Sequence, residues 1–240
     1  IVTPFEAVTG MYSLPGRHDI DPTAILAPFY FLFFGLMLSD AAYGLILTTL
    51  CAIILKKYKP EGTTHRMIKM FMFCGLSTFM WGALFGGWFG NFFTVAAKTF
   101  FGKEFVIRPL WFDPLSEPMR LLVVSLILGA IHLFVGMGVQ AYMDIKDGRP
   151  LDALFDIGLW YLLLIGIVLF AFGGKLGAGA VGIGKIMAIV GAVGILLTGG
   201  RKKKGIFGKL TGGLGSLYGI TSYLSDVLSY SRLLALGLAT

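Results

Sequence analysis

The chain has 240 residues, of which 56% are hydrophobic and 14% are charged, and its formal net charge is +7. A soluble domain has about 45–50% apolar and about 25% charged residues, so this composition excludes an ordinary soluble protein and indicates an integral membrane protein. The basic residues gather in short segments between apolar stretches, such as KKYK at 56–59 and RKKK at 201–204. This distribution orients membrane proteins in the lipid bilayer, and we therefore expect no nucleic-acid partner.

The N-terminal segment has no basic start followed by an apolar core, so it does not resemble a signal peptide. We predict that residues 1–23 are a linker that leads into a membrane region at residues 24–240. The sequence begins without a methionine and stops within an apolar run. We therefore expect it to be a piece of a longer protein that continues at both ends.

Six long apolar stretches follow, and most have the ~20 residues that a helix needs to cross a ~30 Å hydrocarbon core. The first, residues 24–55, would be about 48 Å long as one straight helix. A break at Asp40 would turn it into a helical hairpin. The sequence therefore predicts an all-α polytopic membrane protein with about seven membrane helices, at about residues 24–38, 42–56, 67–96, 119–143, 152–172, 180–198 and 214–240.

The charges of the loops predict the orientation. Cytoplasmic loops of membrane proteins are rich in lysine and arginine, and three alternate loops of this chain are basic, namely residues 56–69, 144–150 and 199–209. With the first stretch as a hairpin, the N-terminus is then also cytoplasmic. Irregular backbone at membrane depth must be covered by protein or water, so Asp40 should face an interior and not lipid.

Three further features carry no catalytic or binding site. Cys51 and Cys74 lie in apolar segments without partners at disulfide or zinc spacing, and we expect them to be small buried hydrophobes. GAVGIGKI at 179–186 nearly matches a phosphate-binding loop, but Ile186 replaces the hydroxyl residue and no strand precedes it. RKKK at 201–204 is more often a solvated loop than a lipid site. We predict no cofactor and no metal.

Ionisable residues inside membrane segments are costly and often functional. Asp40 is one, and His132 in LGAIHLFVGMG is another; for His132 a hydrogen bond within the protein and a functional role are equally open. Asp156 lies close to the start of its segment, which favours a position at the membrane interface.

The last segment has a polar stripe. Ser222, Ser225, Asp226, Ser229 and Arg232 are separated by 3, 1, 3 and 3 positions, so they share one face of a helix. Arginine stays protonated, and a charge at the bilayer centre costs ~3 kcal/mol or more unless it meets water or a carboxylate. Asp226 is too far along the helix to pair with Arg232 face to face. Asp40 remains a possible partner, but an ion path is favoured.

Four segments of the chain resemble the membrane domain of the a/I subunit of rotary V-type (A/V-type) ATPases: PFEAVTGMYSLPGRHDIDPT, APFYFLFFGLMLSDAAYGLIL, LGAIHLFVGMGVQAY and SYLSDVLSYSRLLALGLA. The resemblance covers most of the chain and is strongest at 1–60, 119–145 and 218–240. Ser39–Asp40 stands where the family often has Gly–Asp. The family has eight membrane helices, which implies a last helix after Thr240, and a soluble arm before the membrane domain that joins the stalk subunits.

The resemblance implies a stator for ion transport in a prokaryotic plasma membrane. The a/I subunit stands beside a ring of proteolipid subunits and offers two half-channels for protons or sodium ions. Arg232 would separate them, because it favours the ionised ring carboxylate and repels a leaking cation. The residues of the stripe, Ser222, Ser225, Asp226 and Ser229, would line the cytoplasmic half-channel. Asp40 and His132 would be candidates for the external one.

Two other functions remain open at this stage. A secondary transporter or channel also uses broken helices and charges near the midplane. A structural membrane anchor would tolerate the loss of Arg232 and Asp226. The small residues after Arg232, namely Ala235, Gly237 and Ala239, favour the stator because they form a smooth face for sliding contact with another helix.

Overall fold

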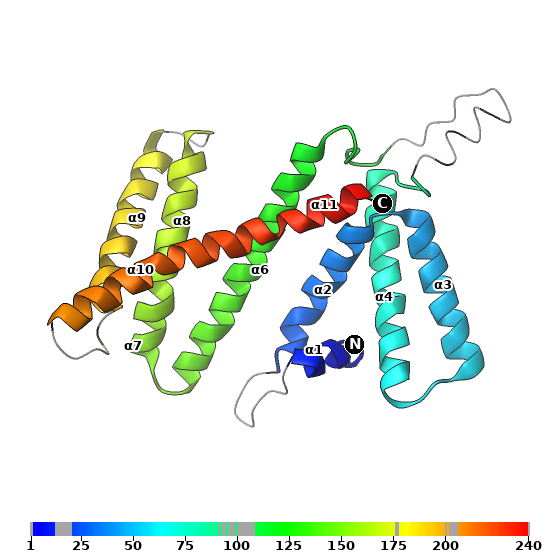
Figure 1. The fold of residues 1–240 in the computed structure, drawn as a ribbon, viewed down its shortest axis with the longest axis horizontal. Coiled ribbons are helices and arrows are strands. Elements are labelled where there is room, and N and C mark those ends of the chain that lie inside the picture. Colours follow the sequence, from blue (N-terminus) through cyan, green and yellow to red (C-terminus); the bar gives the residue numbers. More distant parts are fainter. Residues whose placement is uncertain are drawn as a thin grey trace. The chain divides into compact units, whose positions relative to one another are not determined.

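The computed structural model describes residues 2–12, 21–90, 92, 95, 99, 109–175, 178–199, 201 and 206–239. Every regular element in this part of the chain is helical (Figure 1). The elements are η1 (Thr3–Phe5), α1 (Glu6–Tyr12), α2 (Thr23–Leu38), α3 (Ala41–Tyr58), α4 (Gly62–Phe85), α6 (Pro118–Lys146), α7 (Pro150–Asp152), η2 (Ala153–Gly158), α8 (Leu159–Phe172), η3 (Gly173–Lys175), α9 (Ala178–Thr198), α10 (Ile206–Ser229) and α11 (Ser231–Ala239). They form two units, a first of Ile1–Ile127 with Tyr230–Thr240 and a second of Leu128–Ser229.

Five stretches of the described helices are long and apolar enough to cross a membrane: Ala41–Tyr58, Gly62–Phe85, Pro118–Lys146, Pro150–Ala171 and Gly179–Thr198. The apolar helix α2 is shorter. The all-α polytopic fold is thereby confirmed, and the number of seven membrane helices stays a prediction. Helix α10 is not among the five, because its glycines, serines and Asp226 lower its hydropathy.

The first unit contains the predicted break in the long apolar stretch. Helix α2 ends at Leu38 and α3 begins at Ala41, so the division at Ser39–Asp40 is confirmed. Ser39 has φ 33° and ψ 29°, a left-handed conformation that costs a non-glycine residue about 1–2 kcal/mol. Surrounding contacts must therefore hold this turn in place.

Helix α4 packs against both α2 and α3 in the first unit. Its approach to the break is very close, since a Cβ on Gly82 would lie 2.0 Å from the backbone nitrogen of Ala41. Small residues allow such packing of membrane helices. The predicted helix 67–96 is corrected to Gly62–Phe85, because Gly86 adopts φ 76° and its N–H bonds back to Gly82 O, which ends the helix.

The N-terminal residues are a folded part of the first unit. Phe5 is only 4% exposed and packs with Ala27, Met70 and Cys74. Glu6 forms an exposed ion pair with Arg66 of α4 at 2.7 Å. Within the predicted linker at residues 1–23, η1 and α1 pack onto α4, while residues 13–20 lie outside the described part. The role of this segment as a linker stays a prediction.

The second unit is built around α8 and α9, with α10 packed on α9. Its core consists of Met137, Ile157, Trp160, Leu163 and Ile195. The helix that leads into α8 has one π-helical segment, η2, at whose end Leu159 N–H donates to Leu154 O. This wider turn precedes Trp160, and the Trp160 ring contacts that of Tyr223 on α10 with 4.7 Å between centroids.

The predicted helix 214–240 is two helices. Helix α10 starts earlier, at Ile206, and ends at Ser229; α11 begins at Ser231, and Tyr230 lies between them. The Ser229 hydroxyl donates to Asp226 O at 2.6 Å, and Leu233 N–H bonds to Tyr230 O at 3.0 Å. Such side-chain bonds to the backbone and shorter i→i+3 turns interrupt a regular helix.

Candidate functional site

Arg232 lies on the exposed side of α11. The opposite side of this helix buries Leu233 and Gly237 in the first unit, and the Tyr230 ring lies 5.4 Å from that of Phe33 on α2. Among the described residues, no carboxylate lies within ion-pair distance of Arg232. The exposed side is otherwise apolar or small, with Ala235, Leu236 and Ala239. Gly237, which the sequence predicted for this smooth face, is corrected to the buried side. An uncompensated guanidinium on such a surface is suited to a carboxylate of another molecule.

Asp40 caps α3 and is 2% exposed, which confirms that it faces an interior. Its Oδ1 accepts the N–H groups of Ala42 at 2.9 Å and Tyr43 at 3.1 Å. Its Oδ2 accepts the N–H of Gly90 at 3.0 Å. Asp40 and Arg232 are both described and do not lie within ion-pair distance, so the alternative of an Asp40–Arg232 ion pair is wrong.

The polar stripe of α10 is exposed within the second unit. Ser222, Ser225, Asp226 and Ser229 are all exposed, whereas Tyr223 turns inward to Trp160. The structure thus brings these four together on the outer face of α10, as the spacing predicted. Their continuation to Arg232 stays a prediction from the sequence, because Arg232 belongs to the first unit.

His132 is half-buried on α6, within the part of that helix that belongs to the second unit. Two residues further along α6, Phe134 O accepts a hydrogen bond from the Tyr161 hydroxyl of α8. The Tyr161 and Phe134 rings stack with 5.2 Å between centroids. His132 therefore sits beside a well-packed contact between α6 and α8, and its role in an ion path stays a prediction.

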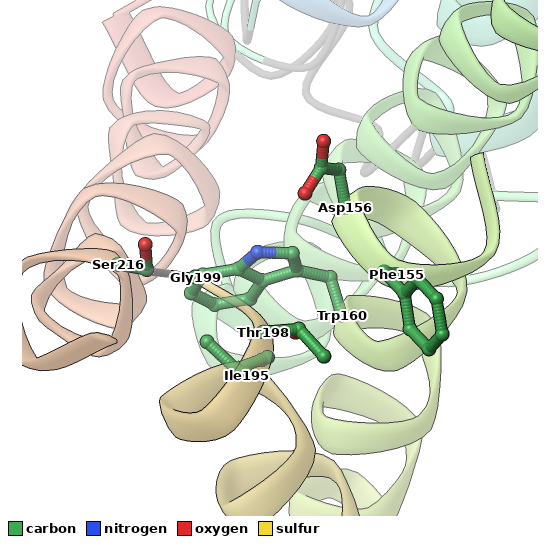
Figure 2. Close-up of a pocket in the computed structure, with 7 residues that line it drawn as sticks. All are labelled: Phe155, Asp156, Trp160, Ile195, Thr198, Gly199 and Ser216. Atoms are coloured by element: carbon green, nitrogen blue, oxygen red, sulfur yellow. The ribbon is translucent and has the colours of Figure 1, made fainter. Parts of the chain in front are cut away.

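A pocket of about 250 Å³ lies in the second unit between the start of α8, the end of α9 and the inner face of α10 (Figure 2). Figure 2 shows Asp156, Trp160 and Ser216 around it. The residues that line it are Phe155, Asp156, Trp160, Ile195, Thr198, Gly199 and Ser216. Since Ser216 faces inward and the stripe faces outward, the pocket is not part of the predicted half-channel.

Arg201 forms the polar cluster beside this pocket. Its Nη2 donates to Asp156 at 3.0 Å and also to Asp152, and its guanidinium lies over the Phe155 ring at 5.3 Å. This cluster was not predicted from the sequence, where Arg201 is the first residue of the basic run RKKK. The spacing of Asp152 and Asp156 by one helical turn was the available signal, but no pattern pointed to an arginine 45 positions away.

The features that we predicted to be structural can also be placed. Cys51 on α3 is 7% exposed and Cys74 on α4 is 0% exposed, which confirms them as buried small residues. Residues 179–186 lie inside α9. Their backbone N–H groups therefore belong to a helix and not to a phosphate-binding loop.

Comparison with known proteins places the chain. No family model matches the sequence. The chain is 33% identical over 269 residues to "A-type ATP synthase subunit I" of Methanocaldococcus jannaschii, which aligns 100% of this chain with 37% of that protein. It is 35% identical over 242 residues to the protein of the same name from Thermococcus kodakarensis, with 99% of this chain and 35% of that protein aligned.

A more distant relative is "V-type ATP synthase subunit I" of Borreliella burgdorferi, which is 23% identical over 244 residues and matches 95% of this chain. The chain spans little more than a third of the length of these curated relatives. Together with the five candidate spans, the comparisons describe a multi-pass membrane protein. The chain belongs to the A/V-type ATP synthase subunit I family.

Proposed function

We propose that this chain is the ion-translocating part of the membrane sector of a rotary A/V-type ATPase, where it acts as the stator beside a ring of proteolipid subunits. The observation that carries this proposal is the position of Arg232. It lies on the outer face of α11, and no described carboxylate pairs with it, while the opposite face is packed against α2. A cation held in this way is available to a partner that slides past.

The ring would supply one carboxylate for each ion site. A positive charge within ~4–6 Å lowers the pKa of a carboxylate by about 1–3 units. Arg232 would thereby favour the ionised ring carboxylate and cause it to release its ion. The same fixed charge would repel a cation that tried to pass directly between the half-channels. The small and aliphatic residues around Arg232 support this, because they leave the face smooth.

We assign the stripe of α10 to the cytoplasmic half-channel, with Asp226 as the relay. The support is that Ser222, Ser225, Asp226 and Ser229 are exposed together although they belong to a helix of a membrane protein. His132 is our candidate for the external half-channel. Asp40, the second candidate from the family resemblance, has its carboxylate occupied by backbone N–H groups, and we assign it a different role below.

The orientation follows from the basic loops, which we place in the cytoplasm together with the N-terminus. The membrane would be the plasma membrane of a prokaryote. The relatives are longer than this chain. A soluble arm before the membrane domain, which the family resemblance implies, would connect the stator to the peripheral and central stalks. The transported ion, proton or sodium, would be selected by the ring.

The test is Arg232→Ala in the assembled ATPase reconstituted into vesicles. We expect ATP-driven ion uptake to be lost while ATP hydrolysis persists, because only the coupling charge is removed. Arg120→Ala is the matched control, since Arg120 is an exposed arginine of α6 that pairs with the nearby Glu117. Uptake that survives in Arg232→Ala as it does in the control would reject the stator function.

A further inference from the structure

The α2–α3 break is the surface on which α11 rests. Gly237 of α11 is buried, and a Cβ on it would lie 3.1 Å from Leu36 O and 3.7 Å from Ser39 Oγ. The Ser39 hydroxyl donates to Gly237 O over 3.4 Å. We call Leu36, Ser39 and Gly237 the α11 seat. All three belong to the first unit, and they fix the depth and rotation of the helix that carries Arg232.

The Asp40 carboxylate, next to Ser39 in the chain, makes three hydrogen bonds on the α3 and α4 side of the break. Two of them close the first turn of α3, and the third ties the break to Gly90, beyond the end of α4. The N–H of Ala41 adds a bond to Gly87 O at 2.8 Å. Ser39 is the next residue before Asp40, so these bonds restrain the backbone directly after its left-handed turn.

We propose that Asp40 is a positioning residue for Arg232. By fixing Ser39 and the last turn of α2, it sets where Gly237 packs and therefore where the guanidinium of Arg232 stands on the outer face. The carboxylate serves as a hydrogen-bond acceptor and does not carry the transported ion. The importance of the Arg232 position for transport rests on the function proposed above. The effect of Asp40 on the α11 seat does not rest on that function.

The first experiment separates positioning from ion transfer. Asp40→Asn and Asp40→Ser cannot exchange a proton in the working pH range. Both residues are good helix caps and can accept the N–H groups of Ala42 and Tyr43. Neither can also accept the N–H of Gly90, because an NH2 group replaces the second oxygen in Asn and Ser has only one oxygen. In the assembled ATPase we expect both to keep more ATP-driven uptake than Asp40→Ala, with an unchanged pH profile. Asp40→Ala should lower uptake about tenfold, as expected for the loss of a helix cap. Loss of uptake in all three variants alike would show that the carboxylate titrates, and would overturn the proposal.

The second experiment measures the seat itself and needs no transport. In a Cys51→Ala and Cys74→Ala background, the pair Ser39→Cys with Gly237→Cys should form a disulfide, since the Ser39 oxygen and a Cβ at Gly237 are 3.7 Å apart. Adding Asp40→Ala should reduce the yield about tenfold, whereas adding Asp40→Asn, which keeps the two cap bonds to Ala42 and Tyr43, should reduce it less. An unchanged yield with Asp40→Ala would overturn the proposal.

A variant on the other side of the seat covers the case in which Asp40→Ala does not assemble. Gly237→Leu leaves Asp40 intact but places a side chain against Leu36 O and Leu121. We expect uptake to fall while ATP hydrolysis continues, and normal uptake would contradict the proposal. If Arg232→Ala keeps transport, the proposed function fails, but the disulfide yields still decide whether Asp40 holds the seat.

Discussion

The guanidinium of Arg201 donates to the Asp156 carboxylate at 3.0 Å and closes the end of α9 onto the helix that leads into α8. It also donates to Asp152, one turn earlier. The side chains of Arg201 and Asp152 are each 25% exposed, so water screens this cluster less than an ordinary surface pair. The cluster therefore contributes to the stability of the second unit.

Arg201→Ala should destabilise the protein by about 1 kcal/mol, because it leaves the partly buried Asp152 beside the more exposed Asp156 without a donor. Equilibrium unfolding in detergent measures the change. Arg149→Ala is the control, since Arg149 also pairs with two carboxylates but its side chain is 55% exposed. We expect a change below about 0.5 kcal/mol there, and equal effects of the two variants would contradict this account of the cluster.

Gly82→Ala should destabilise the first unit by about 1–3 kcal/mol, the usual cost of overpacking. The added Cβ would lie 2.0 Å from the Ala41 backbone nitrogen, which cannot move without loss of the Asp40 cap. Gly136→Ala on α6 has open space around the new Cβ and should be neutral or slightly stabilising. Thermal unfolding of the two variants tests the difference, and a neutral Gly82→Ala would show that α3 and α4 are not in close contact.

Phe5→Ala should cost about 3–5 kcal/mol, as for other buried phenylalanines, if the N-terminal residues are part of the folded unit. Phe5 is 4% exposed, whereas Met11 on the same segment is 71% exposed. Met11→Ala is therefore the control and should leave the free energy of unfolding unchanged. Proteolysis of the intact chain gives a second measurement, since a freed N-terminus would be cut early.

Asp226→Asn should lower ATP-driven uptake about tenfold if the outer face of α10 conducts ions, because a relay loses its titrating group. Stability should not change, since Asp226 is exposed. Ser216→Ala lies on the inner face of the same helix and should transport normally. Should the inner-face variant lose transport and Asp226→Asn keep it, the half-channel would lie on the side of the pocket.

Local patterns in the sequence predicted the structural features that are determined by residues close together in the chain. The excess length of the first apolar stretch predicted the break at Asp40, and the spacing of serines predicted the exposed face of α10. The end of α4 at Gly86 was not predicted, because the apolar run continues beyond this left-handed glycine. The interruption at Tyr230 was not predicted either, because it is a single turn within an apolar run.

Contacts between distant residues were beyond sequence reasoning. Phe5 has no apolar run of its own, and its burial depends on Ala27 and Met70, which the fold brings to it. The Arg201–Asp156 pair joins residues from separate helices in the same way. Asp40 was predicted to be buried, but only the structure identifies the amide groups that its carboxylate binds.

The π-helical segment η2 has a consequence for length variation in this protein. A π-turn contains one residue more than an α-turn, so deleting a single residue between Ala153 and Gly158 would restore a regular helix. The helix itself would tolerate the deletion, but the side chains before it would rotate by about 100° relative to those after it. Asp152 would then turn away from Arg201 while Trp160 kept its place. A one-residue deletion here should therefore rotate the part of the helix that carries Asp152 relative to the part that carries Trp160. We expect the helix content to change little, and the packing of α10 to change more.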